Sequence, residues 1–320
     1  MPLLEVRDLV VEFPTRRGVL RALDRVGLTI NRGEVLGVVG ESGAGKSLTG
    51  AAIMGLLEHP GRIAGGEVRF EGLRIDNLPP EQMRRLRGRR IGMIFQDPLT
   101  TLNPLYTVGR QLAETMQTHM RLSDRAARKR AVEWLEQVGI PAAAHRIDAY
   151  PHEFSGGQRQ RVVIALALCA EPALVIADEP TTALDVSIQA QIIALLKRLT
   201  REHHTAVMLV THDMGVIAET ADRVAVMYAG RVAEVGPVRS VIRAPAHPYT
   251  EGLMASIPAL ERRVERLRQI DGAMPRLDAM PPGCRFHPRC PRAFDRCLTQ
   301  EPPLLDAGAT RAACWLHAHD

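Results

Sequence analysis

The chain has 320 residues, of which 46% are hydrophobic and 24% charged, with a formal net charge of +5. This length and apolar content predict one large domain plus a smaller one and exclude a disordered chain. A positive charge can indicate nucleic-acid binding, but the arginines are scattered and only three lysines occur, Lys46, Lys129 and Lys197. We therefore interpret the charge as a mildly basic surface.

The N-terminal residues do not have the pattern of an export signal, because Glu5, Arg7 and Asp8 interrupt what would have to be its apolar stretch. The longest apolar run, VVIALALCA, has nine residues and is bounded by Arg161 and Glu171. A membrane-spanning helix needs about 20 such residues. We predict that the chain does not span a membrane and that its five cysteines do not form a disulfide framework.

Strand and helix patterns alternate over residues 1–96, on both sides of a glycine-rich loop. We predict strands over LLEVRDLVVEF, EVLGVVG and IGMIFQ, and a helix over KSLTGAAIMGLL. From 97 to about 153 the pattern turns helical, with VGRQLAETMQTHM followed by SDRAARKRAVEWLEQVGI, which Ser123 opens as a candidate N-cap. This stretch is predicted to form an inserted helical subdomain.

The alternation resumes at ALVIADEP, which is followed by the helical pattern SIQAQIIALLKRLTREHH and the strand patterns AVMLVTH and RVAVMYAG. Short apolar strands separated by helices predict an α/β fold with a parallel sheet covered by helices. After Gly236 prolines recur and little strand pattern remains. We therefore predict a main domain over 1–236 and a small tail domain over 237–320.

The segment GESGAGKS, residues 40–47, matches the phosphate-loop pattern G-x-x-x-x-G-K-[ST] and lies between a predicted strand and helix. Its glycines allow a tight turn that points backbone N–H groups at phosphates. Lys46 is expected to reach the terminal phosphates and Ser47 to ligate Mg²⁺. A plain glycine-rich turn would explain neither of these two residues. The predicted ATP-contacting residues here are Gly40, Ser42, Gly43, Gly45, Lys46, Ser47 and Leu48.

The strand pattern ALVIADEP ends in two carboxylates, Asp178 and Glu179. Asp178 can hold Mg²⁺ through water, and Glu179 can activate the water that attacks a phosphate. An apolar strand that ends in Asp-Glu can also simply meet solvent there. In a parallel sheet that carries a phosphate loop, however, the carboxylates emerge at the C-terminal edge, where ligands of such sheets bind.

Further motifs lie between and after these two. FSGGQ, residues 154–158, opens a helix fifteen residues before the acidic strand, and its Ser155 and glycines are suited to a phosphate. Gln96 ends IGMIFQ, Asp185 lies in TALD, and His212 ends AVMLVTH. In this order and spacing, the six elements together resemble the ATP-binding subunit of ABC transporters over residues 3 to about 236.

The resemblance implies that two such subunits face each other head to tail, so that each ATP lies between the phosphate loop of one and the FSGGQ motif of the other. Glu179 would act as general base, and His212 would contact the γ-phosphate. Gln96 would touch Mg²⁺ and sense the membrane partner, and Asp185 would link the two sites. The residues that would hold Mg²⁺ are Ser47, Gln96 and Asp178. Those that would contact the partner's ATP are Ser155, Gly156, Gly157 and Gln158.

Three single positions complete this comparison. Phe13, which lies 27 residues before Gly40, is the candidate for stacking on adenine, although a core strand residue would give the same pattern. Phe154 stands where the family usually has leucine, and Thr182 stands where serine often precedes ALD. Both departures preserve the shape of the motif, so ATPase activity is still predicted.

The tail contains four cysteines with the spacing C-x5-C-x6-C-x16-C. Thiolates suit both Zn²⁺ and iron–sulfur clusters. The spacing lacks the C-x2-C pairs of zinc ribbons, but His287, His317 and His319 keep a mixed zinc site open. Four unrelated buried thiols are a further alternative. The fifth cysteine, Cys169, is predicted to lie in the core.

A narrower resemblance concerns the tail. HPYTEGLMASIP, residues 247–258, followed by GCRFHPRCPRAFDRC and ACWLH, is similar to the C-terminal extension of ATP-binding subunits of oligopeptide and dipeptide importers. Asp271 stands where that group usually has proline. Members of the group carry a four-iron, four-sulfur cluster on these cysteines. The resemblance therefore implies a [4Fe-4S] cluster, with zinc as the alternative, on Cys284, Cys290, Cys297 and Cys314.

The two resemblances together imply an ATP hydrolase that uses ATP and Mg²⁺ to drive import of di- and oligopeptides. It would act at the cytoplasmic face of the inner membrane as a peripheral subunit. The expected partners are two transmembrane permease subunits, a second and paralogous ATP-binding subunit, and an extracytoplasmic substrate-binding protein, with no nucleic acid. The alternatives are a cargo of nickel, glutathione or peptide-like compounds, and a soluble ABC ATPase that acts on nucleic acid or ribosomes.

Overall fold

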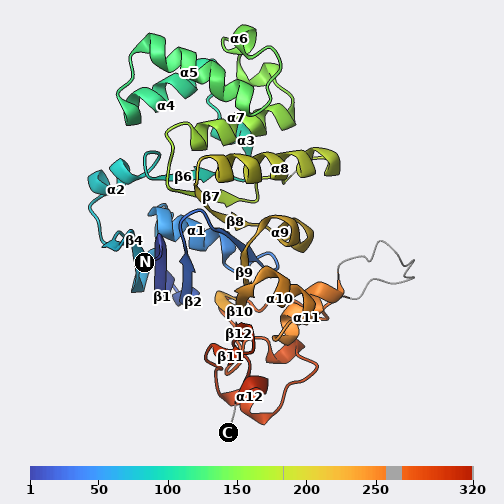
Figure 1. Ribbon diagram of the computed structural model, residues 1–320. Helices are drawn as coiled ribbons and strands as arrows, with labels where there is room; N and C mark the ends of the chain where they lie inside the picture. Colours follow the sequence, from blue (N-terminus) through green and yellow to red (C-terminus); the bar gives the residue numbers. More distant parts are fainter. Residues whose placement is uncertain (183, 257–268, 319–320) are drawn as a thin grey trace. The chain divides into compact units, whose positions relative to one another are not determined.

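Figure 1 shows the strands and helices of the chain, which belong to two units. The first unit comprises Met1–Ile30, Val35–Asn77 and Thr211–Asp320, and the second comprises Asn31–Glu34 and Leu78–Val210. The structure is a computed structural model, and it describes residues 1–182, 184–256 and 269–318.

The first unit contains an antiparallel sheet with the strand order β2-β1-β4-β5. It also contains five strands that are hydrogen-bonded in the order β11-β12-β10-β9-β3. The pair β9–β3 is parallel, and the other neighbouring pairs are antiparallel. Its strands are β1 (Leu4–Thr15), β2 (Gly18–Ile30), β3 (Val35–Val39), β4 (Arg62–Phe70), β5 (Leu73–Arg74), β9 (Arg223–Tyr228), β10 (Arg231–Pro237), β11 (Leu305–Ala307) and β12 (Thr310–Ala312).

The C-terminal segment of the first unit comprises the described residues after Gly236 and is drawn in orange and red in Figure 1. It contains short helices and the strands β11 and β12. The strand content after Gly236 is small, as the sequence pattern indicated, but the two short strands pair antiparallel beside β10 and were not predicted individually. Each has only three residues, too few for an alternation to be read from the sequence. The helices of this unit are α1 (Lys46–Met54), α9 (Met214–Thr220), α10 (Val238–Arg243), α11 (Pro248–Ala255) and α12 (Asp295–Thr299), with the 3-10 turns η2 (His287–Arg289) and η3 (Trp315–His317).

The second unit carries the parallel strands β6 (Ile91–Ile94), β7 (Leu174–Asp178) and β8 (Ala206–Val210), in the order β8-β7-β6. All residues of β7 and β8 are buried, as expected of parallel strands covered on both faces. Its helices are α2 (Pro80–Leu86), α3 (Pro98–Thr101), α4 (Val108–Met120), α5 (Asp124–Gln137), α6 (Ala143–Arg146), α7 (Gly156–Leu168) and α8 (Val186–Glu202), with the 3-10 turn η1 (Pro151–Glu153).

The structure confirms the predicted parallel strands and the predicted helices α4 and α5. Ser123 caps α5, because its hydroxyl accepts the backbone N–H of Ala126 at 3.4 Å. The helices α3 to α6 lie within the range 97–153, but the domain boundaries that we drew from the sequence stay a prediction. Over the part of the chain that the structure describes, no helix is both long and apolar enough to cross a membrane.

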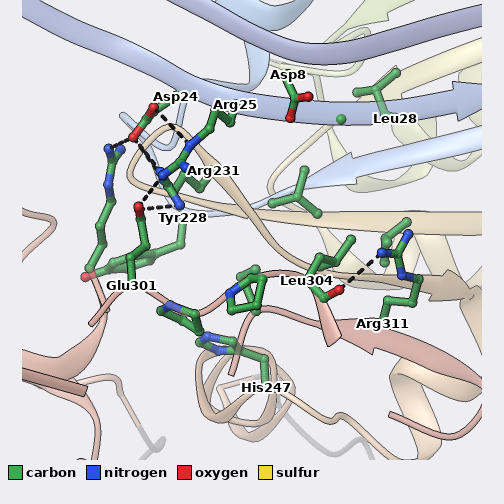
Figure 2. A pocket seen from close by; sticks show the side chains of 18 of the residues that line it. Asp8, Asp24, Arg25, Leu28, Tyr228, Arg231, His247, Glu301, Leu304 and Arg311 are labelled. Carbon is green, nitrogen blue, oxygen red and sulfur yellow. Dashed lines mark hydrogen bonds and ion pairs between the residues drawn. The ribbon is translucent and has the colours of Figure 1, made fainter. Parts of the chain in front are cut away.

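A buried carboxylate joins β2 to the C-terminal segment within the first unit. Asp24, which is 5% exposed, accepts hydrogen bonds from Arg231 Nη2 at 2.7 Å and from Arg285. Figure 2 shows that Arg231 also reaches Glu301. These residues line a cavity of about 520 Å³. Burial by itself would raise the pKa of the Asp24 carboxyl, but the hydrogen bond and charge of Arg231, aided by Arg285, lower that pKa below its ordinary value.

We predict that Asp24→Asn lowers the free energy of unfolding by about 3 kcal/mol at pH 7, because the amide removes the carboxylate that two largely buried guanidinium groups share and leaves only Glu301 as a nearby counter-charge. Urea unfolding of the purified chain measures the change. The matched control is Asp278→Asn, because Asp278 pairs with Arg276 at the surface and the expected change is below about 1 kcal/mol.

The pH dependence provides a second check of the same pair. A carboxyl whose pKa is lowered by folding stabilises the native state above its ordinary pKa, and this contribution disappears as the pH falls through the folded pKa. The stability difference between wild type and Asp24→Asn should therefore shrink below about pH 4. A difference that stays constant into acid would contradict the ion pair.

Candidate functional site

The predicted phosphate loop, residues 40–47, connects β3 to α1 and needs glycine at two positions. Gly40 has φ 152°, and a Cβ there would lie 2.2 Å from the carbonyl oxygen of Met227 in β9. Gly45 is the N-cap of α1 in a left-handed conformation, with φ 100°. Any other residue would clash at position 40 and be strained at position 45. The loop therefore lies directly on β9 and leads into the N-terminus of α1.

Lys46 folds back over this loop. Its side chain is buried, and its Nζ donates to the carbonyl oxygens of Gly40 at 2.9 Å and Glu41 at 3.1 Å. The ammonium therefore lies at the mouth of the loop, beside the N-terminus of α1, where both the lysine and the helix dipole favour an anion. Ser42, Gly43 and Ser47 of the loop are exposed, as phosphate contact requires.

Two other predicted ATP contacts lie less openly. Leu48, in the first turn of α1, is half-buried. Phe13 near the end of β1 is also half-buried. Its ring lies against a different loop at Gly61, where a Cβ added to the glycine would lie 2.7 Å from Phe13 Cε1. The packing of Phe13 on this loop agrees with a core role, and its role in adenine stacking stays a prediction.

The second unit brings the predicted catalytic carboxylate together with two polar side chains. Glu179 accepts hydrogen bonds from Thr182 Oγ1 at 2.8 Å and from Gln96 Nε2 at 3.3 Å. Gln96 follows the end of β6, and Asp178 is the buried last residue of β7. Because β6 and β7 are parallel neighbours, their C-terminal ends place Gln96, Asp178 and Glu179 at one edge of the sheet.

The backbone at Glu179 is held in an unusual conformation. Its φ is 45°, in the left-handed region that residues with a side chain rarely adopt. Its N–H donates to the carbonyl oxygen of Val210 at the end of β8, at a distance of 2.9 Å. The conformation turns the chain away from the strand immediately after Asp178. Strained residues of this kind cluster at functional sites.

The FSGGQ motif forms the N-terminus of α7. Ser155 and Gln158 make a capping box, in which Ser155 Oγ accepts the Gln158 N–H at 3.4 Å and Gln158 Oε1 accepts the Ser155 N–H at 3.1 Å. Gly156 is exposed, and Gly157 packs on Ile188 of α8, where a Cβ would lie 2.8 Å from Ile188 Cγ2. The motif therefore presents an exposed helix start with little side-chain cover.

The phenylalanine in this motif has a packing role. Phe154 is buried, and the guanidinium of Arg146 lies 4.2 Å from the centre of its ring. Arg146 also donates to the carbonyl oxygen of Glu153 at 2.7 Å. The larger ring thus provides a face for the arginine, and the helix start at Ser155 is kept.

Two further predicted residues lie at element ends. Asp185 is the exposed N-cap residue of α8. His212 is exposed two residues after the end of β8 and belongs to the first unit. The next residue, Asp213, caps α9 by accepting the N–H of Gly215 at 2.7 Å. This cap fixes the backbone that carries His212.

The four tail cysteines line one small cavity of about 10 Å³ in the first unit. The backbone N–H of Cys284 donates to the carbonyl oxygen of Cys297 at 2.9 Å, so the backbones at two of the four cysteines are in direct contact. Within residues 1–182, 184–256 and 269–318, however, no group of three or more His, Cys, Asp or Glu side chains is arranged to hold a metal ion. The thiols are gathered in one place, but the structure by itself does not define a metal site.

Burial favours the protonated form of three of these thiols. It raises the pKa of Cys284 to about 11, and it also raises the pKa of Cys290 and of Cys314. Binding of a metal group would therefore have to release protons. Of the candidate histidines, His287 and His317 contact backbone carbonyl oxygens at 2.9 and 2.8 Å, and His319 lies outside the described residues. Cys169 is buried at the end of α7, as predicted.

Two groups, one in each unit, were not predicted from the sequence. Thr182 was noted only as a departure from the family, yet its hydrogen bond to Glu179 is shorter than the one from Gln96. Its position three residues after a carboxylate was the available signal. Glu41 was not singled out, because it occupies a variable position of the phosphate-loop pattern and its partners lie far away in the sequence.

The family models match both parts of the chain. The model described as "ABC transporter" matches residues 23–182, and the model described as "Oligopeptide/dipeptide transporter, C-terminal region" matches residues 233–297. The chain belongs to the ABC transporter family. It has the mixed α/β fold of its ATPases, with ATP hydrolysis coupled to transport as the family's activity.

Relatives of this ABC ATPase match over nearly their whole length. It is 47% identical to the dipeptide transport ATP-binding protein DppD of Escherichia coli, over 95% of this chain and 93% of that protein. It is 45% identical to the oligopeptide transport ATP-binding protein AppD of Bacillus subtilis, over 99% and 98%. A solved dimeric ATP-binding cassette bound to ADP and Pi shares 30% identity with a TM-score of 0.66, covering 74% of this chain and 99% of that chain.

Proposed function

We propose that the chain is the ATP-hydrolysing subunit of an importer of dipeptides or oligopeptides. The observation that carries this proposal is the match of residues 233–297, after the ABC core, to the family model of the C-terminal region of oligopeptide and dipeptide transporters. The ABC core alone would fit many transported cargoes. The relatives named for dipeptide and oligopeptide transport, which align over both parts, support the same cargo class.

ATP would bind with its phosphates in the loop 40–47. The N–H groups of Ser42, Gly43, Gly45, Ser47 and Leu48 and the start of α1 would face the phosphate oxygens. On binding, Lys46 would exchange its two carbonyl partners for the β- and γ-phosphates, which are stronger partners because they carry charge. Phe13 would stack on the adenine.

Hydrolysis would depend on the residues at the C-terminal ends of β6 and β7 in the second unit. Glu179 would take the proton of the attacking water, and its hydrogen bonds from Gln96 and Thr182 would fix the orientation of the carboxylate. His212 would contact the γ-phosphate. Oxygen donors suit Mg²⁺, and Ser47, Gln96 and Asp178 would supply them. When bound, Mg²⁺ neutralises charge on the β- and γ-phosphates.

The complete site would need a second ATP-binding subunit. Ser155, Gly156, Gly157 and Gln158 would contact the ATP of that partner at the exposed N-terminus of α7. The capping box leaves Ser155 Oγ with a long bond of 3.4 Å, so the hydroxyl can turn to a phosphate at small cost. Asp185 would link the two sites. A solved cassette with the same fold is a dimer bound to ADP and Pi, which supports this arrangement.

The remaining partners follow from the transport function. Two transmembrane permease subunits would form the path through the inner membrane, and this chain would be a peripheral subunit at its cytoplasmic face. An extracytoplasmic binding protein would deliver the peptide. The second ATPase subunit is proposed to be a paralogue of this chain. The cargo alternatives, nickel, glutathione and peptide-like compounds, would use the same ATPase, whereas a nucleic-acid or ribosome function would need none of these partners.

Purification of the native complex from membranes tests this function directly. We expect two permease subunits and a second ATP-binding chain to co-purify, and we expect the binding protein to retain a short peptide that mass spectrometry identifies. Nickel or glutathione on the binding protein would contradict the cargo but leave the ATPase assignment intact. Recovery with ribosomes or DNA in place of permeases would overturn the transport function.

We predict that Glu179→Gln lowers ATP turnover of the assembled complex by about two to four orders of magnitude, because an amide cannot accept the proton of the attacking water. ATP binding should persist, and a closed, ATP-loaded form should accumulate. Phosphate release and nucleotide retention measure the two effects. The control is Glu202→Gln, which changes an exposed carboxylate paired with Arg198 and should leave turnover unchanged. Near-normal turnover in Glu179→Gln would place the general base elsewhere.

We also propose a [4Fe-4S] cluster on Cys284, Cys290, Cys297 and Cys314. The support is the donor set, because four thiols that line one cavity suit iron–sulfur clusters and, as the alternative, zinc. Such a group would stabilise the segment, because the segment is short and its sequence has few large apolar residues. In that role the cluster would hold the segments around α12 and η3 together.

Protein purified without oxygen should be brown, with a broad visible absorbance that bleaches on reduction and with iron and acid-labile sulfide in matching amounts. Cys290→Ser should remove most of the colour and make the segment after residue 236 more sensitive to proteolysis. The control is Cys169→Ala, which changes the remaining cysteine, buried in the second unit, and should keep the colour. A colourless, zinc-loaded protein would defeat the cluster proposal.

A further inference from the structure

Glu41, the second residue of the phosphate loop, is held by two side chains from the C-terminal part of the chain. Its carboxylate pairs with Arg289 in a two-pronged contact, with Nη1 at 2.7 Å from Oε2 and Nη2 at 2.9 Å from Oε1. Its backbone N–H donates to the hydroxyl of Tyr249 at 2.8 Å. All three residues belong to the first unit.

Arg289 is also held by contacts other than the one to Glu41. Its side chain is 6% exposed, and Nε donates to the carbonyl oxygen of Asp271 at 2.9 Å. Nη2 also reaches the carbonyl oxygen of Ile270 at 3.3 Å, and Nη1 lies 3.4 Å from the hydroxyl of Tyr228. A guanidinium held in this way presents its planar fork in one orientation, which matches a carboxylate. The position of Glu41 is therefore determined by a rigid partner.

Tyr249 is equally well fixed. It is fully buried in α11, and its ring packs edge-on against Tyr228 with a centroid distance of 4.6 Å. Its backbone N–H donates to Nδ1 of His247, the N-cap of α11, at 3.0 Å. The backbone N–H of His247 in turn donates to the buried carboxylate of Glu234 at 3.0 Å. This chain of contacts ties the Tyr249 hydroxyl to β10.

The contacts meet at one peptide group. The carbonyl oxygen of Gly40 and the N–H of Glu41 belong to the same peptide, and they bond to Lys46 on one side and Tyr249 on the other. A peptide held at both ends cannot rotate without breaking a hydrogen bond. The adjoining residue is a glycine, the residue whose backbone is otherwise freest to rotate. If Lys46 turns to the phosphates, the contacts to Tyr249 and Arg289 remain.

We propose that Arg289 and Tyr249 are positioning residues for ATP binding: they hold Glu41 and so keep the phosphate loop in its nucleotide-binding shape. The C-terminal segment thereby contributes to the ATP affinity of a loop that lies more than 200 positions earlier in the sequence. The inference rests on the proposed function of residues 40–47 as the ATP-binding loop. It adds to that function two residues that act through Glu41 rather than on the phosphates.

The test measures ATP binding and turnover of the full chain in the assembled complex. Arg289→Ala should raise the Kd for ATP with Mg²⁺ about tenfold, which corresponds to ~1.4 kcal/mol. The KM for ATP should rise by a similar factor, whereas kcat at saturating ATP should change less than about twofold, because the bound geometry is restored once ATP fills the loop. Arg289→Lys keeps the charge but loses the fork, so its Kd should lie between those of wild type and Arg289→Ala.

A double-mutant cycle separates positioning from a general structural role. In a Glu41→Gln background, Arg289→Ala should raise the Kd much less than it does in the wild type, because its partner carboxylate is already gone. Additive effects would overturn the proposal. The matched control, Arg276→Ala, removes an exposed arginine of the same segment that pairs with Asp278, and its Kd should equal that of wild type.

Tyr249→Phe provides a variant that keeps the packed ring and removes only the hydroxyl, in case Arg289→Ala does not fold. Its Kd should rise about threefold, the loss of part of one hydrogen bond. An unchanged Kd in both Tyr249→Phe and Arg289→Ala, with thermal unfolding showing folded protein, would overturn the inference. Lys46→Ala distinguishes this result from failure of the proposed function: if Lys46→Ala abolishes ATP binding, the loop assignment stands without the positioning residues, and if it does not, the loop assignment itself fails.

Discussion

The contact between the loop 40–47 and β9 is the constraint on which the proposed ATP-binding site depends. At Gly40 the backbone lies so close to the Met227 carbonyl that even a methyl group would clash. The loop is fixed on the same side farther along, because the N–H of Gly230 donates to the carbonyl oxygen of Ala44 at 2.9 Å. With its backbone fixed on a sheet, the loop can present N–H groups to a highly charged ligand in a geometry that exists before the ligand arrives.

Carboxylates with buried partners join the C-terminal segment to the rest of the first unit at three places. Asp24 pairs with Arg231 and Arg285, Glu41 pairs with Arg289, and Glu234 accepts backbone N–H groups of the turn before α11. In each case the partner is an arginine fork or a backbone amide, which needs a defined direction of approach. Directional contacts of this kind specify one arrangement of two segments better than apolar packing does.

The sequence predicted those parts of the structure whose cause is local. Strand β7 follows from a run of apolar residues, α4 from its apolar spacing, and the phosphate loop from its glycines and lysine. It did not predict the pairing of β12 with β10 or the contact of Thr182 with Glu179, because strand partners and side-chain orientation depend on residues that meet only in the fold. The tail cysteines were recognised by their spacing, but the small cavity that they share could not be.

The ion pair between Glu41 and Arg289 also orders events during synthesis of the chain. The two residues are 248 positions apart, and a ribosome adds about 5 to 20 residues per second, so the second partner follows the first by roughly 12 to 50 s. Throughout that interval the nascent chain carries the loop, its strand and its helix without the arginine fork. The proposed nucleotide site therefore gains this ion pair only after residue 289 has been synthesised. A chain halted before residue 289 would display an ATP-binding motif in the sequence while lacking one of the groups that shape it.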